Sequence, residues 1–337
     1  MPLTLLFPDS RSEVLDLEKK VFADDTVFLN PRKPSFGEID LKSWQECDGI
    51  VVARIQMNTS VIAQLKKCRI IVRNGVGYDN VDLELAGREG IAVCNVPDYG
   101  TTEVADSAIA MMLTFARGTA IYDAKLREDP SAWTHLHNVT SRRLRGATYG
   151  VIGMGRIGTA SALRARAFGM NVLFYDPNLS IGAELSFGFT RAKRLQDLLE
   201  ASDVISIHAP LNKDTDRMIN AQTVTQIKPG AYVISTARGP ICDTAALLEG
   251  LKSNRLLAVG LDVLPTEPAT MTDPLVAAWR ANEPWIRGRV LIGPHSGFYS
   301  PDSLVDLRTK AAETVRQYLK EGKLINCVNA EYLKNPR

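Results

Sequence analysis

Residues 148–158 read T-Y-G-V-I-G-M-G-R-I-G, and this stretch decides the fold of the C-terminal half of the chain. The first five residues are typical of a buried β-strand, and a helical pattern follows from Arg156 to Phe168. Gly153 permits a tight turn, Gly155 lets a ligand approach the backbone, and Gly158 lets the helix pack on the strand. The stretch therefore predicts a strand, a turn and a helix whose amino terminus binds an anion.

The next strand, Asn171–Tyr175, is followed by Asp176, eighteen residues after Gly158. A carboxylate at that position accepts hydrogen bonds from the adenosine ribose of a dinucleotide, whereas glycines alone could form a purely structural turn. The negative charge repels the extra phosphate of NADP, and no cation follows, so we expect NAD, with NADH preferred over NADPH. The cofactor-binding residues predicted from this pattern are Gly153, Gly155, Arg156, Ile157, Gly158 and Asp176.

Short β-rich runs alternate with helical segments along the whole chain, which predicts an α/β fold with parallel sheets. The strands expected in the first hundred residues are Leu3–Phe7, Gly49–Ala53, Arg69–Val72 and Ala92–Val96. Six more are expected later: Thr148–Ile152, Asn171–Tyr175, Asp203–His208, Ala231–Thr236, Ala258–Asp262 and Arg289–Ile292. The second group forms a doubly wound sheet. We also expect helices at Glu13–Phe22, at Val61–Cys68 and from Thr101, which can cap its helix.

The last helix, roughly 303–321, has no strand after it, so we expect it to return to the first lobe. This interpretation gives a discontinuous domain of residues 1–98 and 300–337, and a second domain of residues 99–299. Two domains also suit a chain of 337 residues.

The composition, 45% hydrophobic and 23% charged with a formal charge of +2, is that of a soluble globular protein. So small a charge gives no reason to expect nucleic acid or a membrane surface as partner, and we expect a small molecule instead. The first nine residues show no export signal, and five scattered cysteines suit reduced thiols, so we expect a cytoplasmic protein.

Three motifs follow successive strands of the second domain, at the sheet edge where α/β proteins bind ligands. They are S-T-A-R-G (235–239), D-V-L-P-T-E-P (262–268) and P-H-S-G-F (294–298). Taken singly, Arg238 could be a surface residue, Glu267 could cap a turn, and His295 could be structural. Together they place a cation, a carboxylate and an imidazole at one edge, which indicates catalysis.

In this order and setting, the motifs resemble the NAD-dependent D-isomer-specific 2-hydroxyacid dehydrogenase family, and most closely its C-terminal-binding-protein-like branch. R-N-G-V-G-Y-D-N (73–80) and the segment Ala165–Pro177 extend the resemblance over nearly the whole chain. It implies a flavodoxin-like substrate domain plus a Rossmann NAD-binding domain. It also implies an oxidoreductase that transfers a hydride between NAD(H) and a D-2-hydroxy acid/2-keto acid pair, and a homodimer formed through the NAD-binding domain, for which the helix from Thr101 to Arg117 is the candidate interface.

The chemistry gives each catalytic residue a role. Hydride delivery to a keto carbon builds negative charge on its oxygen, so a fixed cation and a proton donor lower the barrier. Arg238 would bind the substrate carboxylate and polarise the carbonyl. His295 would give the alkoxide its proton, and Glu267 would orient the imidazole and stabilise its protonated form.

The resemblance also implies further contacts. Asp262 would hold the nicotinamide carboxamide, and Thr102 would reach the nicotinamide side. The remaining cofactor contacts implied are His208, Ala209, Pro210, Thr236, Ala237, Arg238 and His295, the first three through backbone. The substrate contacts implied are Arg73, Asn74, Gly75, Val76, Gly77, Arg238, His295 and Phe298. Arg73 would favour an acid with a second polar group, or could be a solvent-exposed residue at a strand end.

Two other functions stay open at this point: an NAD-sensing scaffold or corepressor like some C-terminal-binding proteins, and a phosphoglycerate dehydrogenase. Val76 departs from the small polar residue usual in the latter, and Phe298 stands where the C-terminal-binding-protein branch usually has Trp, so its substrate preference is not inherited. His135 and His137 have a spacing found in metal sites, but no third ligand is near in sequence, so we expect no metal.

Overall fold

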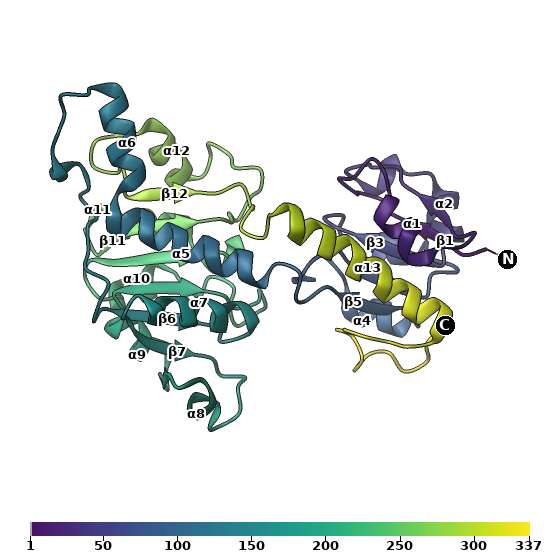
Figure 1. The fold of residues 1–337 in the computed structure, drawn as a ribbon. Coiled ribbons are helices and arrows are strands. Elements are labelled where there is room, and N and C mark those ends of the chain that lie inside the picture. Colours follow the sequence, from purple (N-terminus) through teal and green to yellow (C-terminus); the bar gives the residue numbers. More distant parts are fainter. Residues whose placement is uncertain (1) are drawn as a thin grey trace. The chain divides into compact units, whose positions relative to one another are not determined.

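The computed structural model describes residues 2–337. These residues divide into two compact units: in Figure 1 the first is coloured purple to blue and, at its C-terminal segment, yellow, and the second runs from teal through green to yellow-green. Unit 1 consists of the residues up to Gly100 together with Ser300–Arg337, and unit 2 is Thr101–Tyr299. The chain thus leaves unit 1 after its last strand and returns to it in a long helix.

Unit 1 contains a parallel sheet with the strand order β2-β1-β3-β4-β5 over the described residues. The two strands β3 and β5 are buried throughout, because helices cover both faces of the sheet. The strands are β1 (Thr4–Leu6), β2 (Val27–Leu29), β3 (Gly49–Val52), β4 (Ile70–Arg73) and β5 (Ala92–Asn95).

Helix α13 packs on α1 and on strands β3 and β4, which places the C-terminal helix in the core of unit 1 (Figure 1). Arg308 of α13 fixes this packing by donating hydrogen bonds of 2.8 and 2.7 Å to the buried Glu18. The opposite face holds a core around Trp44. The helices of unit 1 are α1 (Asp16–Phe22), η1 (Phe36–Glu38), α2 (Leu41–Glu46), α3 (Thr59–Ile62), α4 (Leu83–Arg88) and α13 (Pro301–Glu321).

Unit 2 contains a second parallel sheet, whose order within the described chain is β12-β11-β10-β9-β6-β7-β8. The reversal of order between β9 and β6 makes this sheet doubly wound and creates the switch point at which such sheets bind ligands. The strands are β6 (Thr148–Ile152), β7 (Asn171–Tyr175), β8 (Thr190–Arg191), β9 (Val204–Ile207), β10 (Ala231–Ser235), β11 (Leu256–Leu261) and β12 (Val290–Ile292).

Helices cover both faces of the unit 2 sheet. Helices α5 and α7 pack together on one face, over a core that includes Phe115, Tyr149 and Phe174, and α9 to α11 lie over the other (Figure 1). The helices are α5 (Thr101–Arg117), α6 (Thr119–Glu128), η2 (His135–His137), α7 (Arg156–Ala167), α8 (Ala183–Phe187), α9 (Leu195–Ala201), α10 (Ala221–Gln226), η3 (Gly239–Ile241), α11 (Thr244–Lys252) and α12 (Pro274–Ala281).

The predicted α/β class with two parallel sheets is confirmed, and some details are corrected. The expected helix Val61–Cys68 is the shorter α3, which begins after Asn58 because that side chain accepts hydrogen bonds from the backbone of Ser60 and Val61. Thr101 does not cap α5: it is the first helical residue, and its hydroxyl is buried without a partner in the part of the chain that the structure describes. Strands β2 and β8 were not predicted.

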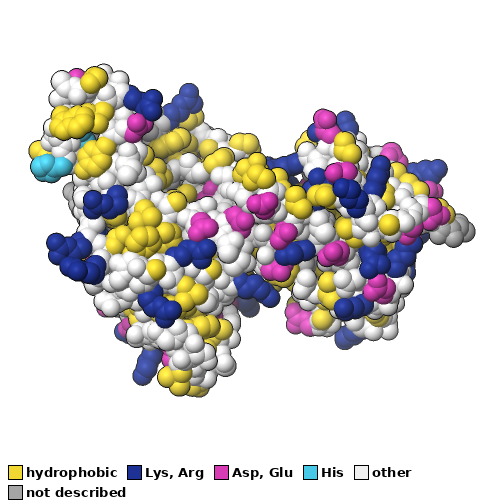
Figure 2. Space-filling model, viewed as in Figure 1, with side chains coloured by type: hydrophobic (Ala, Val, Ile, Leu, Met, Phe, Trp, Pro, Cys, Tyr) yellow, Lys and Arg dark blue, Asp and Glu magenta, His cyan; other side chains and the backbone are white. Residues whose placement is uncertain are grey.

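No single helix within residues 2–337 is long and apolar enough to cross a membrane, and only the bent pair α5 and α6 meets the requirement by length and composition. On the face seen in Figure 2, cationic and anionic side chains are interspersed over both units. That face carries no extended area of one charge.

Candidate functional site

The glycine turn after β6 has the geometry that its sequence predicts. Gly153 has a φ of +87°, which side-chain-bearing residues rarely adopt, and a Cβ on Gly158 would lie 2.1 Å from the carbonyl oxygen of Gly153. A Cβ on Gly155 would meet no atom within 4 Å among the described residues. The turn is thus closely packed on the protein side and open on the other, at the amino terminus of α7, where Arg156 and Ile157 begin the helix.

Asp176 lies immediately after β7 and is tied to this turn. Its Oδ2 accepts a hydrogen bond from the Met154 backbone N–H (2.9 Å), and its Oδ1 accepts one from Asn178 N–H (2.9 Å). A carboxylate has about four acceptor positions, so two remain for ligand hydroxyls. The open side of Gly155 and the amino terminus of α7 fit the pyrophosphate of a dinucleotide. The partly exposed carboxylate of Asp176 lies beside them and fits its ribose.

His208 follows β9 and lies beside the end of β10. Its Nε2 is 2.8 Å from the Ser206 hydroxyl, and its Nδ1 is 3.4 Å from the Thr236 hydroxyl. Burial lowers the pKa of His208 to about 4, so the ring is neutral near pH 7. Ala209 packs against Gly153, where an added Cβ would lie 2.7 Å from Ala209 N, and the exposed Pro210 follows. This segment thus closes one side of the glycine turn.

Arg238 follows β10, after Thr236 and Ala237. Its Nη1 donates a hydrogen bond to the Ala237 carbonyl oxygen (2.8 Å). The next residue, Gly239, approaches the loop after β11 so closely that an added Cβ would lie 1.9 Å from the backbone of Leu264. The loop that carries Arg238 therefore touches the loop that carries Glu267.

Glu267 and His295 are hydrogen-bonded to each other. Glu267 Oε2 lies 2.8 Å from His295 Nδ1, and Glu267 Oε1 accepts a hydrogen bond from Leu264 N–H (3.1 Å). Both side chains are about one-third exposed, at 33% and 29%. With Nδ1 bonded to a carboxylate, Nε2 is the ring nitrogen that can exchange a proton with a ligand.

Asp262 holds the loop that carries His295. The buried carboxylate accepts hydrogen bonds from the backbone N–H groups of Ser296 (3.0 Å) and Gly297 (2.8 Å), and its backbone oxygen accepts one from His295 N–H (2.8 Å). His295 has a φ of +55°, which is unfavourable for a histidine. Asp262 therefore maintains an uncommon backbone conformation beside the imidazole.

Ser107 of α5 and the ring of Phe298 also contact the loop that carries His295, and Thr102 lies at the start of α5. Ser107 donates a hydrogen bond to the Gly297 carbonyl oxygen (3.1 Å), a contact that sequence reasoning missed. The Thr102 hydroxyl donates to Glu103 (2.8 Å) at the start of the helix. Phe298 meets the His295 ring edge to face, with centroids 6.4 Å apart. The histidine is thus held through Asp262, Glu267 and the loop contact of Ser107.

The loop after β4 in unit 1 contains the other predicted residues. The Arg73 guanidinium donates to the Asn74 carbonyl oxygen (3.1 Å) and lies against Gly75, where an added Cβ would be 1.6 Å from Nη1. Asn95 at the end of β5 donates from Nδ2 to the Val76 carbonyl oxygen (2.6 Å), next to Gly77. Sequence reasoning missed Asn95; its position at a strand end was the available signal.

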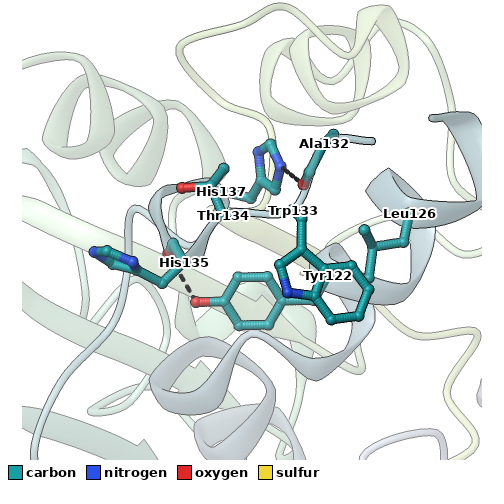
Figure 3. Close-up of a pocket in the computed structure, with 7 residues that line it drawn as sticks. All are labelled: Tyr122, Leu126, Ala132, Trp133, Thr134, His135 and His137. Atoms are coloured by element: carbon teal, nitrogen blue, oxygen red, sulfur yellow. Dashed lines mark hydrogen bonds between the residues drawn. The ribbon is translucent and has the colours of Figure 1, made fainter. Parts of the chain in front are cut away.

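His135 and His137 lie in a different region of unit 2, beside α6 (Figure 3). The Tyr122 hydroxyl donates to the His135 carbonyl oxygen (2.9 Å), and His137 Nε2 lies 2.9 Å from the Ala132 carbonyl oxygen. Together with Trp133 they line a surface hollow. Among residues 2–337, no group of three or more His, Cys, Asp or Glu side chains could hold a metal ion.

Comparison with known families gives one match over more than half of the chain. The sequence pattern described as D-isomer specific 2-hydroxyacid dehydrogenase, NAD binding domain, matches residues 109–297. This range contains the glycine turn and ends just after His295.

Individual relatives extend the similarity beyond that range. The chain is 33% identical over 308 residues to glyoxylate reductase of Korarchaeum cryptofilum (strain OPF8), covering 89% of this chain and 88% of that protein. It is 31% identical over 287 residues to C-terminal-binding protein 1 of Caenorhabditis elegans, covering 82% of this chain but 38% of that protein. The crystal structure of D-lactate dehydrogenase from Aquifex aeolicus, complexed with NAD and lactic acid, superposes with a TM-score of 0.83 at 26% identity over 98% of both chains.

Proposed function

Because the chain belongs to the D-isomer-specific 2-hydroxyacid dehydrogenase family, we propose that Arg238, Glu267 and His295 catalyse the reaction of that family here. The protein is an NAD-binding oxidoreductase that interconverts 2-keto acids and D-2-hydroxy acids. The observation that carries the residue assignment is the 2.8 Å hydrogen bond between Glu267 and His295 Nδ1. It leaves Nε2 of a firmly oriented ring for the substrate oxygen.

The proposed mechanism assigns one task to each side chain. Bound NADH supplies the hydride that reaches the keto carbon. The Arg238 guanidinium pairs with the substrate carboxylate and stabilises the charge that grows on the carbonyl oxygen. His295 donates its Nε2 proton to that oxygen, and Glu267 stabilises the imidazolium before the transfer. In the oxidative direction, neutral His295 accepts the proton.

We assign cofactor binding to unit 2. We assign the preference of the enzyme for NADH over NADPH to Asp176. The open side of Gly155 and the amino terminus of α7 suit a pyrophosphate, and the Asp176 carboxylate suits ribose hydroxyls. A 2′-phosphate would meet this carboxylate with only Pro177 and Asn178 following it. Contacts from the rest of the predicted set complete the proposed site: Thr102, Arg156, Ile157, Gly158, His208, Ala209, Pro210, Thr236, Ala237 and Asp262.

We assign residues 1–98 and 300–337 to a substrate domain and residues 99–299 to the NAD-binding domain, and the unit boundaries at Gly100 and Tyr299 support this division. In the substrate domain, the N–H groups of Gly75 to Gly77 would bind the substrate carboxylate. Arg73, with Asn74, would favour acids with a second polar group. Arg73→Ala should therefore raise KM for hydroxypyruvate more than for pyruvate, and equal increases would remove Arg73 from substrate selection.

Reduction of 2-keto acids is favoured over the two other functions considered. The glyoxylate reductase matches this chain over 88% of its length, whereas C-terminal-binding protein 1 matches over 38% of its own. No observation favours a phosphoglycerate dehydrogenase specifically.

We further propose a cytoplasmic homodimer that pairs through the NAD-binding domain. The apolar face of α5, the helix first expected at the interface, is buried within unit 2, whereas Trp133 and Leu136 near α6 are 83% and 72% exposed. Such exposed apolar side chains mark interaction surfaces. Five free cysteines fit a reducing compartment. In analytical ultracentrifugation we expect the unmodified protein to sediment as a dimer and Trp133→Asp to sediment as a monomer.

The test of the function is NADH oxidation with glyoxylate, hydroxypyruvate, pyruvate, phenylpyruvate and 2-ketoglutarate, with NADPH in parallel. We expect rapid turnover of at least one acid and a kcat/KM at least about tenfold higher with NADH, because the Asp176 carboxylate would repel the 2′-phosphate of NADPH. NADH binding without turnover of any acid would favour the sensing scaffold. Equal use of NADPH would remove Asp176 from cofactor selection.

A further inference from the structure

The C-terminal segment of unit 1 runs antiparallel to β5 and places two cysteines opposite each other. Cys94 of β5 forms an isolated antiparallel bridge with Cys327. Val328 N–H donates to the Val93 carbonyl oxygen (2.8 Å), and Asn95 N–H donates to the Asn326 carbonyl oxygen (3.2 Å). These hydrogen bonds flank the cysteine pair, so Cys94 and Cys327 are a non-hydrogen-bonded pair of the ladder.

This pairing fixes the distance between the two residues. In a non-hydrogen-bonded antiparallel pair the Cα atoms are about 4.5 Å apart and the side chains are on the same face. A disulfide needs Cα atoms roughly 4.4 to 6.8 Å apart, so the pair lies at the short end of the range. A bond formed there requires no movement of the backbone and is more readily reduced than a relaxed one.

The segment that carries Cys327 is firmly held. The fully buried Asn329 accepts a hydrogen bond from Val93 N–H (2.8 Å) and donates to the carbonyl oxygens of Ile91 (3.1 Å) and Leu83 (3.3 Å). The Cys327 thiol also donates a hydrogen bond to Asn329 Oδ1 (3.4 Å), while the three bonds of Asn329 to the backbone hold the segment against β5. Each thiol therefore meets the other because the backbone holds it there.

The two thiols differ in access and in acidity. Cys94 is fully buried, whereas Cys327 is half-buried. A hydrogen bond with the Cys94 thiol lowers the pKa of Cys327 to about 6, and the same hydrogen bond, together with burial, raises the pKa of Cys94. Cys327 is thus the more exposed and the more acidic of the two cysteines, and hence the one that is more readily converted to a thiolate.

We propose that Cys94 and Cys327 form a reversible disulfide that fastens the C-terminal segment to β5 when a small-molecule disulfide oxidises the protein. The pair is then a redox modification site with Cys327 as the attacking thiol and Cys94 as the resolving thiol.

The exchange balances as follows. The Cys327 thiolate attacks one sulfur of oxidised glutathione, which forms a mixed disulfide and expels one glutathione thiolate. Cys94 passes its proton to that thiolate and attacks the Cys327 sulfur, which expels the second glutathione as a thiolate. This thiolate takes up from solvent the proton that Cys327 released when it ionised. The two protein thiols lose two electrons and two protons, and one glutathione disulfide becomes two thiols.

The disulfide would act next to the loop that contains Gly75 to Gly77. Asn95, adjacent to Cys94, holds the Val76 carbonyl oxygen, and Val96 N–H donates to the Gly75 carbonyl oxygen (3.0 Å). Fixing β5 at Cys94 would restrict the strand that supports this loop. This consequence for substrate binding rests on the proposed function, whereas the disulfide itself does not.

Cys47 and Cys68 provide an internal contrast. Their thiols also lie together, and the hydrogen bond with Cys68 raises the pKa of Cys47, but both residues are fully buried and donate to backbone oxygens of Trp44 and Ile70. An oxidant reaches neither thiol without unfolding. Proximity alone therefore does not make a site here, and the exposure of Cys327 does.

The experiment is to incubate the native full-length chain in buffers with increasing ratios of oxidised to reduced glutathione, quench with acid, alkylate, and measure the intact mass and linked peptides. We expect a loss of two hydrogen atoms, one peptide pair joining Cys94 to Cys327, and full reversal by reduced glutathione. Cys327→Ser and Cys94→Ala should both abolish the linkage, and the control Cys242→Ala should retain it. The linked form should melt about 5 °C higher.

A stable glutathione adduct on Cys327 without linkage, a linkage of Cys47 to Cys68, or an unchanged mass would each overturn the proposal. If Cys94→Ala fails to fold, Cys327→Ser on the half-buried partner gives the same test. The KM for a 2-keto acid, measured on the linked and reduced forms, tests the consequence for the loop. Because the mass measurement needs no turnover, an inactive protein would contradict the proposed function and leave the redox site standing.

Discussion

Units 1 and 2 share one plan, a parallel sheet covered by helices, but they hold the loops at their strand ends in different ways. In unit 2, ionisable side chains are fastened to other loops: Glu267 to His295, and Asp262 to Ser296 and Gly297. In unit 1, Asp9 also fastens another loop, because it accepts hydrogen bonds from the N–H groups of Ala53 and Ile55. The unit 1 loop with the predicted substrate contacts, however, is held by the neutral Asn95, which donates to the carbonyl oxygen of Val76. The difference indicates that unit 2 positions an acid–base pair, Glu267 and His295, whereas the supported loop of unit 1 presents backbone N–H groups next to Arg73.

The largest expected effect comes from removing the proton donor of unit 2. His295→Gln should lower kcat by about three orders of magnitude and leave the Kd of NADH within about twofold, because the ring serves proton transfer. Steady-state kinetics and NADH fluorescence titration measure the two quantities. The control His137→Gln changes a histidine beside α6 and should behave as the parent. Retention of full activity by His295→Gln would end the assignment.

Weakening the loop that supports His295, while the imidazole itself is kept, should lower kcat less. Asp262→Asn places an amide against one of two backbone N–H groups, so kcat should fall about tenfold while the pH dependence of kcat keeps its shape. Asp9→Asn is the matched control, because Asp9 also accepts hydrogen bonds from backbone N–H groups on both carboxylate oxygens, from Ala53 on Oδ1 (2.9 Å) and from Ile55 on Oδ2 (2.8 Å). An equal loss in both variants would mean that Asp262 has only a general structural role.

Weakening the support of the corresponding loop in unit 1 should affect the binding of the keto acid. Asn95→Ala removes the donor to Val76, a loss of about 1 kcal/mol, so KM for the keto acid should rise several-fold while kcat is retained. Asn30→Ala, which removes a donor to the Ser12 carbonyl oxygen in the same unit, is the control. A fall in kcat without a change in KM would break the contrast between the units.

The last effect concerns stability in acid and leaves the catalytic contrast itself untouched. The pKa of His208 is lowered from 6.5 to about 4 in the folded state, so between these values the unfolded chain binds a proton that the folded chain does not. Stability therefore falls as pH drops through this window, by on the order of 2 kcal/mol. His208→Gln should reduce the loss, as measured by urea unfolding at pH 7.5 and pH 5. An unchanged loss would show that other groups dominate.

Much of this contrast was predictable from sequence because it lies in short-range patterns. The glycine turn, Asp176 and the residues at strand ends follow from spacing along the chain. Strands β2 and β8 did not, since Val27–Leu29 and Thr190–Arg191 are short, incompletely buried strands at sheet edges without a clear pattern.

The supports of the site were hidden for a different reason. Asp262 bonds to backbone N–H groups 34 and 35 residues away, and Asn95 bonds to a carbonyl oxygen 19 residues earlier. A backbone partner leaves no signature in the side chains of a single sequence. Glu267 and Asp262 could therefore be named in advance, whereas the backbone contacts of Asp262 and the part played by Asn95 required the fold.

The most direct test of the account uses NADH that carries deuterium at the transferable position of its nicotinamide. The labelled cofactor is mixed with the best 2-keto acid, and the product is examined by mass spectrometry and chiral chromatography. We predict a D-2-hydroxy acid with deuterium at C2. Unlabelled product, the L isomer, or bound NADH that leaves every keto acid unreduced would contradict the account.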